Sequence, residues 1–209
     1  MPGTSLEKIL FVFRHGETDW NREGRFQGST DIPLNETGRL QADALRRFFA
    51  RNPVDAFMTS DLVRALETAE IANRDLRAPI VSDRRLRETN LGVAEGLTRQ
   101  EIVETFGTEI LRQWAETFPP DLDYRFPSGE SKAEHLARLL AAIEHNVKSH
   151  PHSTWGVATH GGAIRRLIHH LVPNLTSPVM VANAAVYEMR FDLVKGHLRL
   201  IDLEPKLTS

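Results

Sequence analysis

Side chains that can bind and transfer a phosphoryl group stand shortly after four short apolar runs of the chain. Arg14 and His15 follow the first run, Arg64 comes after the second, Glu88 after the third and His160 after the fourth. Because ligands of open α/β sheets bind outside the carboxyl ends of the strands, we expect these groups to meet at one edge of a sheet. Two histidines, two arginines and a carboxylate suit an anionic, tetrahedral substrate.

Phosphoryl transfer explains why these residue types would be needed together. A phosphate monoester dianion repels nucleophiles, so rigid donors must first neutralise its charge. Arginine does this well because its planar fork can bind two phosphoryl oxygens at once. A neutral imidazole can then attack phosphorus in line, and a carboxylic acid can protonate the leaving alcohol. No Walker loop, Asp-x-Asp pair or His-Glu-x-x-His motif offers a rival mechanism.

The elements that must position these groups alternate between short apolar runs and helical patterns. This alternation predicts an α/β three-layer sandwich, with a mostly parallel central sheet and helices on both faces. The predicted strands cover residues 8–14, 55–59, 79–82, 154–159, 185–192 and 197–202, the last two joined by a hairpin turn at Gly196 and His197. The predicted helices cover residues 36–51, 62–76, 98–106, 109–118, 131–149 and 161–171.

Three of these helices carry a capping signal at their start. Asn35 precedes the first, Asp61 or Ser60 is expected to cap the second, and Ser131 with Glu134 forms a capping-box pattern. Gly161 and Gly162 open the last helix, where free N–H groups and the helix dipole favour an anion.

The pattern weakens between residues 90 and 127, where we expect a small helical insertion over the active site. A chain of 209 residues fits a single catalytic domain, residues 1–209, that can bury a full core. The aromatic residues of this stretch are expected in the core of the insertion, with one or two as candidates to line the substrate pocket: Phe106, Trp114, Phe118, Tyr124 and Phe126.

The composition excludes several classes of function. A net charge of −2 provides no global field that would recruit nucleic acid or an anionic membrane. The absence of cysteine excludes thiol chemistry, iron–sulfur clusters and cysteine-based zinc sites. The first apolar run is too short for a signal peptide or a membrane span. We therefore expect a cytoplasmic protein with a small-molecule partner and no nucleic-acid or membrane partner, and we leave its oligomeric state open.

A series of short motifs runs in order from Arg14 to Arg165. It comprises Arg14-His15-Gly16-Glu17-Thr18 with Trp20-Asn21, Gly24-Arg25-Phe26-Gln27-Gly28, Asp31-Ile32-Pro33-Leu34, Gly38 with Gln41-Ala42, Ser60-Asp61-Leu62 with Arg64-Ala65 and Thr68-Ala69, Leu86-Arg87-Glu88, Gly129-Glu130-Ser131 and Thr159-His160-Gly161-Gly162. In this order the series resembles the signature of the histidine phosphatase superfamily, the phosphoglycerate-mutase-like proteins.

This resemblance implies a role for each matching residue. His15 would be the phosphorylated nucleophile, and Glu88 the general acid that later activates water. Arg14, Arg64 and His160 would form the phosphate pocket around His15. The positions that match the substrate side are Asn21, Gln27, Gly28 and the backbone N–H of Gly161. The family uses no metal, so we expect neither a metal nor another cofactor.

The neighbours Arg14 and His15 set a geometric condition on the site. Adjacent residues face opposite ways within a regular strand. The two side chains can therefore converge only if the strand ends there, and Gly16 permits the turn.

Three alternatives stay open. Glu95 also follows the third strand and rivals Glu88 as the acid, although Glu88 follows Leu-Arg as the family acid does. A phosphoglycerate mutase would use the same phosphohistidine, but the stretch 90–96 is short and lacks the cations that would hold a second phosphate. A catalytically dead phosphate-binding module is the third, and the intact set of candidate residues argues against it.

The remaining histidines show no metal-ligand spacing. We expect them at the surface or at helix ends: His135, His145, His150, His152, His169, His170 and His197. The motifs do not name the physiological substrate.

Overall fold

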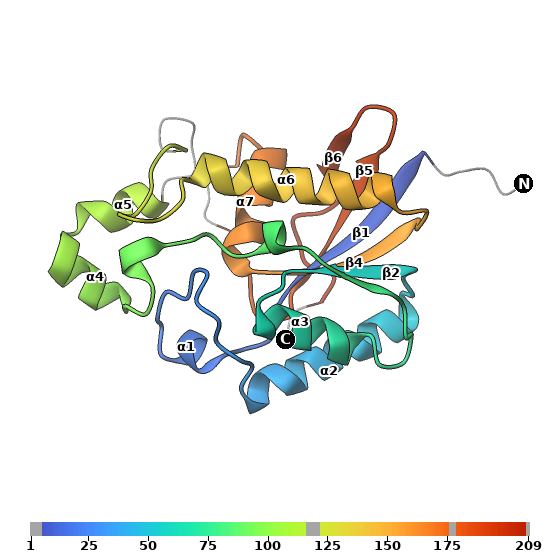
Figure 1. Ribbon diagram of the computed structural model, residues 1–209, viewed down its shortest axis with the longest axis horizontal. Helices are drawn as coiled ribbons and strands as arrows, with labels where there is room; N and C mark the ends of the chain where they lie inside the picture. The colour runs from blue at the N-terminus through green and yellow to red at the C-terminus, as the bar shows by residue number, and fades with distance from the viewer. Residues whose placement is uncertain (1–5, 116–121, 176–178, 208–209) are drawn as a thin grey trace, which may run out of the picture.

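A single mixed sheet forms the centre of the molecule, as the computed structural model of residues 6–115, 122–175 and 179–207 shows (Figure 1). Its strand order is β3-β2-β4-β1-β5-β6. The strands are β1 (Glu7–Arg14), β2 (Ala56–Thr59), β3 (Ile80–Ser82), β4 (Thr154–Thr159), β5 (Val186–Asp192) and β6 (His197–Leu200). Neighbours from β3 to β1 pair in parallel, whereas β5 pairs antiparallel with both β1 and β6.

Helices cover both faces of this sheet, which confirms the predicted three-layer α/β fold. The α-helices are α1 (Asp19–Arg22), α2 (Glu36–Arg51), α3 (Val63–Ala72), α4 (Arg99–Phe106), α5 (Glu109–Ala115), α6 (Lys132–Ser149) and α7 (Gly161–Leu171). Two 3₁₀ turns, η1 (Arg84–Leu86) and η2 (Gly92–Ala94), lie between β3 and α4. In Figure 1, α2 and α3 lie against one face of the sheet and α6 and α7 against the other.

The alternation of side chains along β1 explains its uninterrupted apolar run. Leu10 and Val12 belong to the core that also includes buried residues of α6 and α7. Phe13 belongs to the opposite core, beside Leu45 and Phe49 of α2. Because both faces of the strand are buried, both sets of side chains must be apolar.

The register of the parallel strands brings their carboxyl ends to one edge. Arg14 at the end of β1 lies opposite Thr159 at the end of β4. Thr59 at the end of β2 lies opposite Ala158 of β4 and Ser82 of β3. The residues that follow these four strands therefore start from neighbouring places, as the sequence predicted.

Two of the three predicted caps are present and one is not. The Asn35 side chain accepts the Gly38 N–H at 2.8 Å, and Ser131 and Glu134 form a capping box. For α3, the prediction of a cap at Asp61 or Ser60 was wrong. The N-cap is Leu62, and Asp31 from a distant loop accepts the Val63 N–H at 2.7 Å.

Some element boundaries differ from those predicted. Helix α3 ends at Ala72 rather than at residue 76, because the Asn73 side chain exchanges two hydrogen bonds with the backbone of Ala78. The short helix α1 was not predicted. Its N-terminus is a capping box between Thr18 and Asn21.

The segment after β3 builds its own apolar cluster beyond the sheet. Its buried members are Leu91, Ala94, Ile102, Leu111 and Phe126. Figure 1 shows α1, α4 and α5 together on the side of the molecule where β1 and β4 end. The predicted helix 109–118 is described as far as Ala115, and Phe118 lies outside the described residues. Within those residues, no helix combines the length and apolarity needed to cross a membrane.

Candidate active site

The end of β1 presents His15 at the carboxyl edge of the sheet. The strand ends at Arg14, and the His15 N–H donates to the Thr159 carbonyl of β4 at 3.0 Å. Gly16 is the next residue. Its φ is not positive, so the turn does not require glycine for a left-handed backbone. A Cβ on Gly16 would lie 2.3 Å from the Gly38 carbonyl oxygen, so close contact between two backbones requires this glycine.

The His15 ring is buried with its tautomer set by a neighbour. Its Nδ1 lies 2.6 Å from the Gly16 carbonyl oxygen, which can only accept, so Nδ1 carries the proton and Nε2 the free electron pair. Burial, together with the charges of Arg64 and Arg14, holds the pKa of His15 well below its ordinary value. At neutral pH the imidazole is therefore an uncharged base with Nε2 available as a nucleophile.

Two guanidinium groups lie close enough to this ring to lower its pKa, those of Arg64 and of the partly exposed Arg14. Arg64, from the first turn of α3, is fully buried, and its Nη1 and Nη2 each donate at 2.7 Å to the carbonyls of Thr30 and Gly28. The Nη1 of Arg14 donates to the Val181 carbonyl at 2.7 Å. Burial lowers the pKa of both groups to about 10, so both stay protonated at neutral pH.

In each guanidinium the Nε donor, at least, has no partner within the described part of the chain. The Nε atoms of Arg14 and Arg64 are buried and make no hydrogen bond with the described residues. A buried donor of this kind is costly unless a ligand accepts from it. Two fixed cations with unused donors beside a neutral nucleophile form the kind of pocket that a phosphate group requires.

His160 follows β4 and stands at the N-cap of α7 with its ring against His15. The ring centroids are 5.2 Å apart, and both His160 nitrogens are buried without a partner among the described residues. Burial, and then the charge of Arg64, holds the pKa of His160 well below its ordinary value. His160 therefore adds a second neutral imidazole to the pocket.

Glu88 lies in the stretch between η1 and η2, and both of its carboxylate oxygens are held. Oε2 accepts the Gly162 N–H at 2.7 Å, and Oε1 accepts the N–H of Thr89 at 2.9 Å. Gly162 must be a glycine for this contact, because a Cβ there would lie 2.4 Å from Glu88 Oε1. The charge of Glu88 also raises the pKa of both Arg14 and Arg64, against the larger effect of burial.

Glu95, the rival for the acid, is occupied with holding a loop. Its Oε1 accepts from the N–H and hydroxyl of Ser29 and from the Leu91 N–H, at 2.8 to 3.0 Å. Its Oε2 accepts from the Thr30 hydroxyl at 2.5 Å. These contacts stabilise the loop whose carbonyls bind Arg64.

The positions expected on the substrate side are partly structural. Gly28 has a positive φ of 53°, and its carbonyl binds Arg64. Asn21 accepts from the Asn183 amide at 3.2 Å, and that amide also donates to the His15 carbonyl. Gln27 is buried with its Oε1 free of partners within the described part of the chain. Gly161 lies next to the Arg14 side chain, and a Cβ on Gly161 would lie 3.1 Å from Arg14 Nε.

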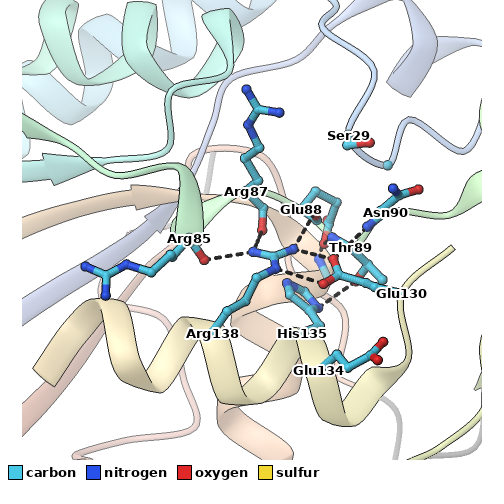
Figure 2. Close-up of polar contacts among 12 residues, drawn as sticks. Ser29, Arg85, Arg87, Glu88, Thr89, Asn90, Glu130, Glu134, His135 and Arg138 are labelled. Carbon is cyan, nitrogen blue, oxygen red and sulfur yellow. Dashed lines mark hydrogen bonds and ion pairs between the residues drawn. The ribbon is translucent and has the colours of Figure 1, made fainter. Parts of the chain in front are cut away.

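Two of the histidines expected at the surface or at helix ends are buried, although both lie near the ends of their helices, His135 at the start of α6 and His169 in the last turn of α7. His135 is fully buried, and its Nδ1 lies 2.6 Å from the Thr89 hydroxyl, next to Glu88 in the chain. His169 is also buried. Figure 2 shows His135 on α6 beside Arg138 and Glu130. All three residues contact the stretch 83–91 that carries Glu88, which we call the Glu88 segment. The helical pattern of α6 does not distinguish an inward polar side chain from a solvated one.

The structure thus places a neutral histidine, two cations, a second imidazole and a held carboxylate on the segments that follow four neighbouring strands. The roles of these residues remain predictions. Among the described residues, no group of three or more histidine or acidic side chains is placed to hold a metal ion.

Known proteins share both the sequence pattern and the fold. A model of the histidine phosphatase superfamily (branch 1) matches residues 10–203. The uncharacterized phosphatase PhoE of Bacillus subtilis is 31% identical, over 95% of this chain and 96% of the relative. The 2,3-bisphosphoglycerate-dependent phosphoglycerate mutase 2 of Gloeobacter violaceus is 32% identical, over 83% and 81%. A solved structure of mycobacterial glucosyl-3-phosphoglycerate phosphatase in complex with VO3 aligns with a TM-score of 0.76 at 28% identity, over 88% of this chain and 92% of that one.

Proposed function

The chain belongs to the histidine phosphatase superfamily, and on that premise we propose that it is a metal-independent phosphatase acting through a phosphohistidine on His15. The observation that carries the proposal is the state of the His15 ring. Its Nδ1 is bound to the Gly16 carbonyl, its depressed pKa keeps it neutral, and Arg64 and Arg14 contribute to that depression. A neutral Nε2 beside two cations is the arrangement needed to attack a phosphate dianion.

In the first step, Nε2 of His15 forms a bond to phosphorus while the bond from phosphorus to the ester oxygen breaks. Arg14, Arg64 and His160 bind the equatorial oxygens, where negative charge accumulates. Glu88 donates its proton to the departing alkoxide, which leaves as the alcohol. The free Nε donors of the two arginines support this assignment.

In the second step, a water molecule attacks the phosphohistidine. Glu88, now a carboxylate, takes a proton from the water. At the same time the water oxygen forms a bond to phosphorus, and the bond between phosphorus and Nε2 of His15 breaks. Inorganic phosphate leaves, and the protonated acid and the neutral His15 are restored. The hydrogen bond from the Gly162 N–H to Oε2 orients the Glu88 carboxylate for this step.

We favour hydrolysis over isomerisation for this chain. The chain and the Bacillus phosphatase match over nearly their whole lengths, whereas 81% of the mutase is covered. After Glu88, the stretch 90–96 contains no lysine or arginine that could hold a second phosphate group. We also propose a small-molecule phosphate ester as the partner and a cytoplasmic location, in keeping with the modest net charge and the absence of cysteine.

The phosphohistidine is tested by rapid mixing of the enzyme with p-nitrophenyl phosphate. We expect a burst of nitrophenolate and a phosphorylated His15, detected by mass spectrometry after an alkaline quench. His15→Ala should abolish both, while replacement of the exposed His145 by alanine should leave both unchanged. Phosphoenzyme at the wild-type level in His15→Ala would refute the proposal.

The same enzyme with 3-phosphoglycerate and a trace of 2,3-bisphosphoglycerate separates hydrolysis from isomerisation. We expect phosphate release with little 2-phosphoglycerate. Isomerisation that outruns hydrolysis many-fold would show instead that the chain is a mutase.

A further inference from the structure

The segment that carries Glu88 has no strand or helix partner for much of its backbone. This segment, 83–91, contains η1 and the stretch up to η2, and its carbonyls need hydrogen-bond donors from elsewhere in the fold. One guanidinium supplies three of them. Arg138 of α6 donates from Nη1 to the carbonyls of Arg85 and Arg87 at 2.7 and 2.8 Å, and from Nη2 to the carbonyl of Glu88 at 2.8 Å.

Figure 2 shows this guanidinium enclosed by the segment, with the side chains of Arg85 and Arg87 directed away from it. The contact is therefore to the backbone of the segment, around the residue that we assign as the acid. The Arg138 side chain is 23% exposed, so most of it is shielded from water.

Glu130, just before α6, holds the guanidinium in place. It accepts from Arg138 Nε at 2.8 Å and from Nη2. The same carboxylate accepts the Asn90 N–H at 2.8 Å, and the Glu130 N–H donates to the Asn90 carbonyl at 3.0 Å. Arg138 and Glu130 therefore bind the segment on both sides of Glu88. The negative charge of Glu130 neutralises the positive charge of Arg138.

Other contacts attach the segment without touching Glu88. The Thr159 hydroxyl donates to the Leu86 carbonyl at 2.8 Å, and His135 pairs with the Thr89 hydroxyl. Arg138 binds the backbone of Glu88 itself, while the N–H groups of Gly162 and Thr89 hold its carboxylate.

We propose that Arg138, oriented by Glu130, is a positioning residue for the acid–base step and acts through the backbone of Glu88. The inference rests on the proposed function of Glu88 as the acid and names what aligns it. Proton transfer needs the carboxyl group within hydrogen-bond reach of the leaving oxygen. Loss of three donors from one side of the segment lets the backbone move, and a misplacement of about 1 Å can cost about 10²-fold in rate.

A leaving-group series separates this role from a purely structural one. Glycerol 3-phosphate has a poor leaving group that needs the proton, whereas p-nitrophenyl phosphate needs little protonation. We expect Arg138→Met to lower kcat/KM for glycerol 3-phosphate by about 10²-fold and that for p-nitrophenyl phosphate by less than about 10-fold. Arg85→Gln, which removes an ion pair with Asp83 on the same segment, serves as the control and should affect both esters equally and weakly.

A double-mutant cycle with Glu88→Gln gives the decisive reading. If Arg138 acts through Glu88, Arg138→Met should slow glycerol 3-phosphate turnover no further in the Glu88→Gln background. Independent, multiplying losses would overturn the inference, as would equal losses for the two esters in Arg138→Met. If Arg138→Met does not fold, Arg138→Lys is judged by the same two criteria.

The cycle also distinguishes failure of the inference from failure of the proposed function. Glu88→Gln alone must show the selective loss on glycerol 3-phosphate. If it does not, Glu88 is not the acid, and that part of the proposed function falls together with the inference. If it does and Arg138→Met shows no such loss, the positioning role falls alone.

Discussion

Gly162→Ala is a test of the site that removes no functional group. Gly162 is the second residue of α7, and its N–H donates to Glu88 Oε2. An added Cβ would lie 2.4 Å from Oε1 and 2.9 Å from Cδ, and real Cβ contacts essentially never fall below 3.0 Å. The carboxylate must therefore retreat by at least 0.6 Å, the difference between 3.0 and 2.4 Å.

The size of this retreat sets the expected loss of activity. A misplacement of about 1 Å in a reacting group can cost about 10²-fold in rate. We expect kcat/KM for glycerol 3-phosphate to fall by about 10- to 10²-fold, and that for p-nitrophenyl phosphate by less, since its leaving group needs little protonation. Stability should hold or rise by up to about 1 kcal/mol, because alanine is the better helix former and only a side-chain end has to move.

The assay measures kcat/KM with both esters and the melting temperature of each variant. Gly161→Ala is the matched control, since its Cβ would meet Arg14 Nε at 3.1 Å and not Glu88. Its loss should be smaller and should not depend on the leaving group. Full activity of Gly162→Ala on glycerol 3-phosphate would refute the reasoning, and a melting temperature lowered by several degrees would show that the backbone had moved instead.

Three further predictions concern metal, pH and the loop glutamate. Activity should survive EDTA and dialysis while vanadate inhibits it, and loss of the chemical step on chelation would exclude the phosphohistidine route. The free energy of unfolding should fall as the pH drops below about 6.5. There the unfolded chain binds protons that the buried His15, His135 and His160 do not, worth up to about 1.4 kcal/mol per pH unit for each histidine. Urea unfolding at pH 7 and 5.5 measures this slope, and equal stabilities would contradict the depressed pKa values. Glu95→Gln should lower stability by about 1–3 kcal/mol because its four loop hydrogen bonds weaken. It should show no extra loss on poor leaving groups, and such a loss would make Glu95 the acid.

The sequence alone was sufficient for the fold class and the family. The apolar runs of β1 and β4 and the caps at Asn35 and Ser131 are local signals, and each depends on residues a few positions apart. The order of motifs identified the family over residues that the family model also matches. The rule that ligands bind at the carboxyl ends of parallel strands is enough to place the candidate residues at one edge of the sheet from the sequence.

Contacts between distant residues could not be predicted in this way. The polar side chains of α6 follow the pattern of a solvated face, yet His135 and Arg138 point inward to Thr89 and to the Glu88 backbone, 46 and 50 residues away. Asp61, predicted as a cap, instead pairs with Arg87. Which polar residue is buried depends on the unpaired backbone groups that it meets.

The two adjacent glycines of α7 show the same division. The sequence indicated that a glycine-rich helix start would favour an anion, and Gly161 was the expected contact. Only the tertiary structure decided that the carboxylate of Glu88 binds the N–H of Gly162, because that choice depends on where a chain segment 74 residues away crosses the helix. Residue types and local spacing thus determined which chemistry this protein could perform, whereas the packing of α6 and α7 against the Glu88 segment decided how the acid is held.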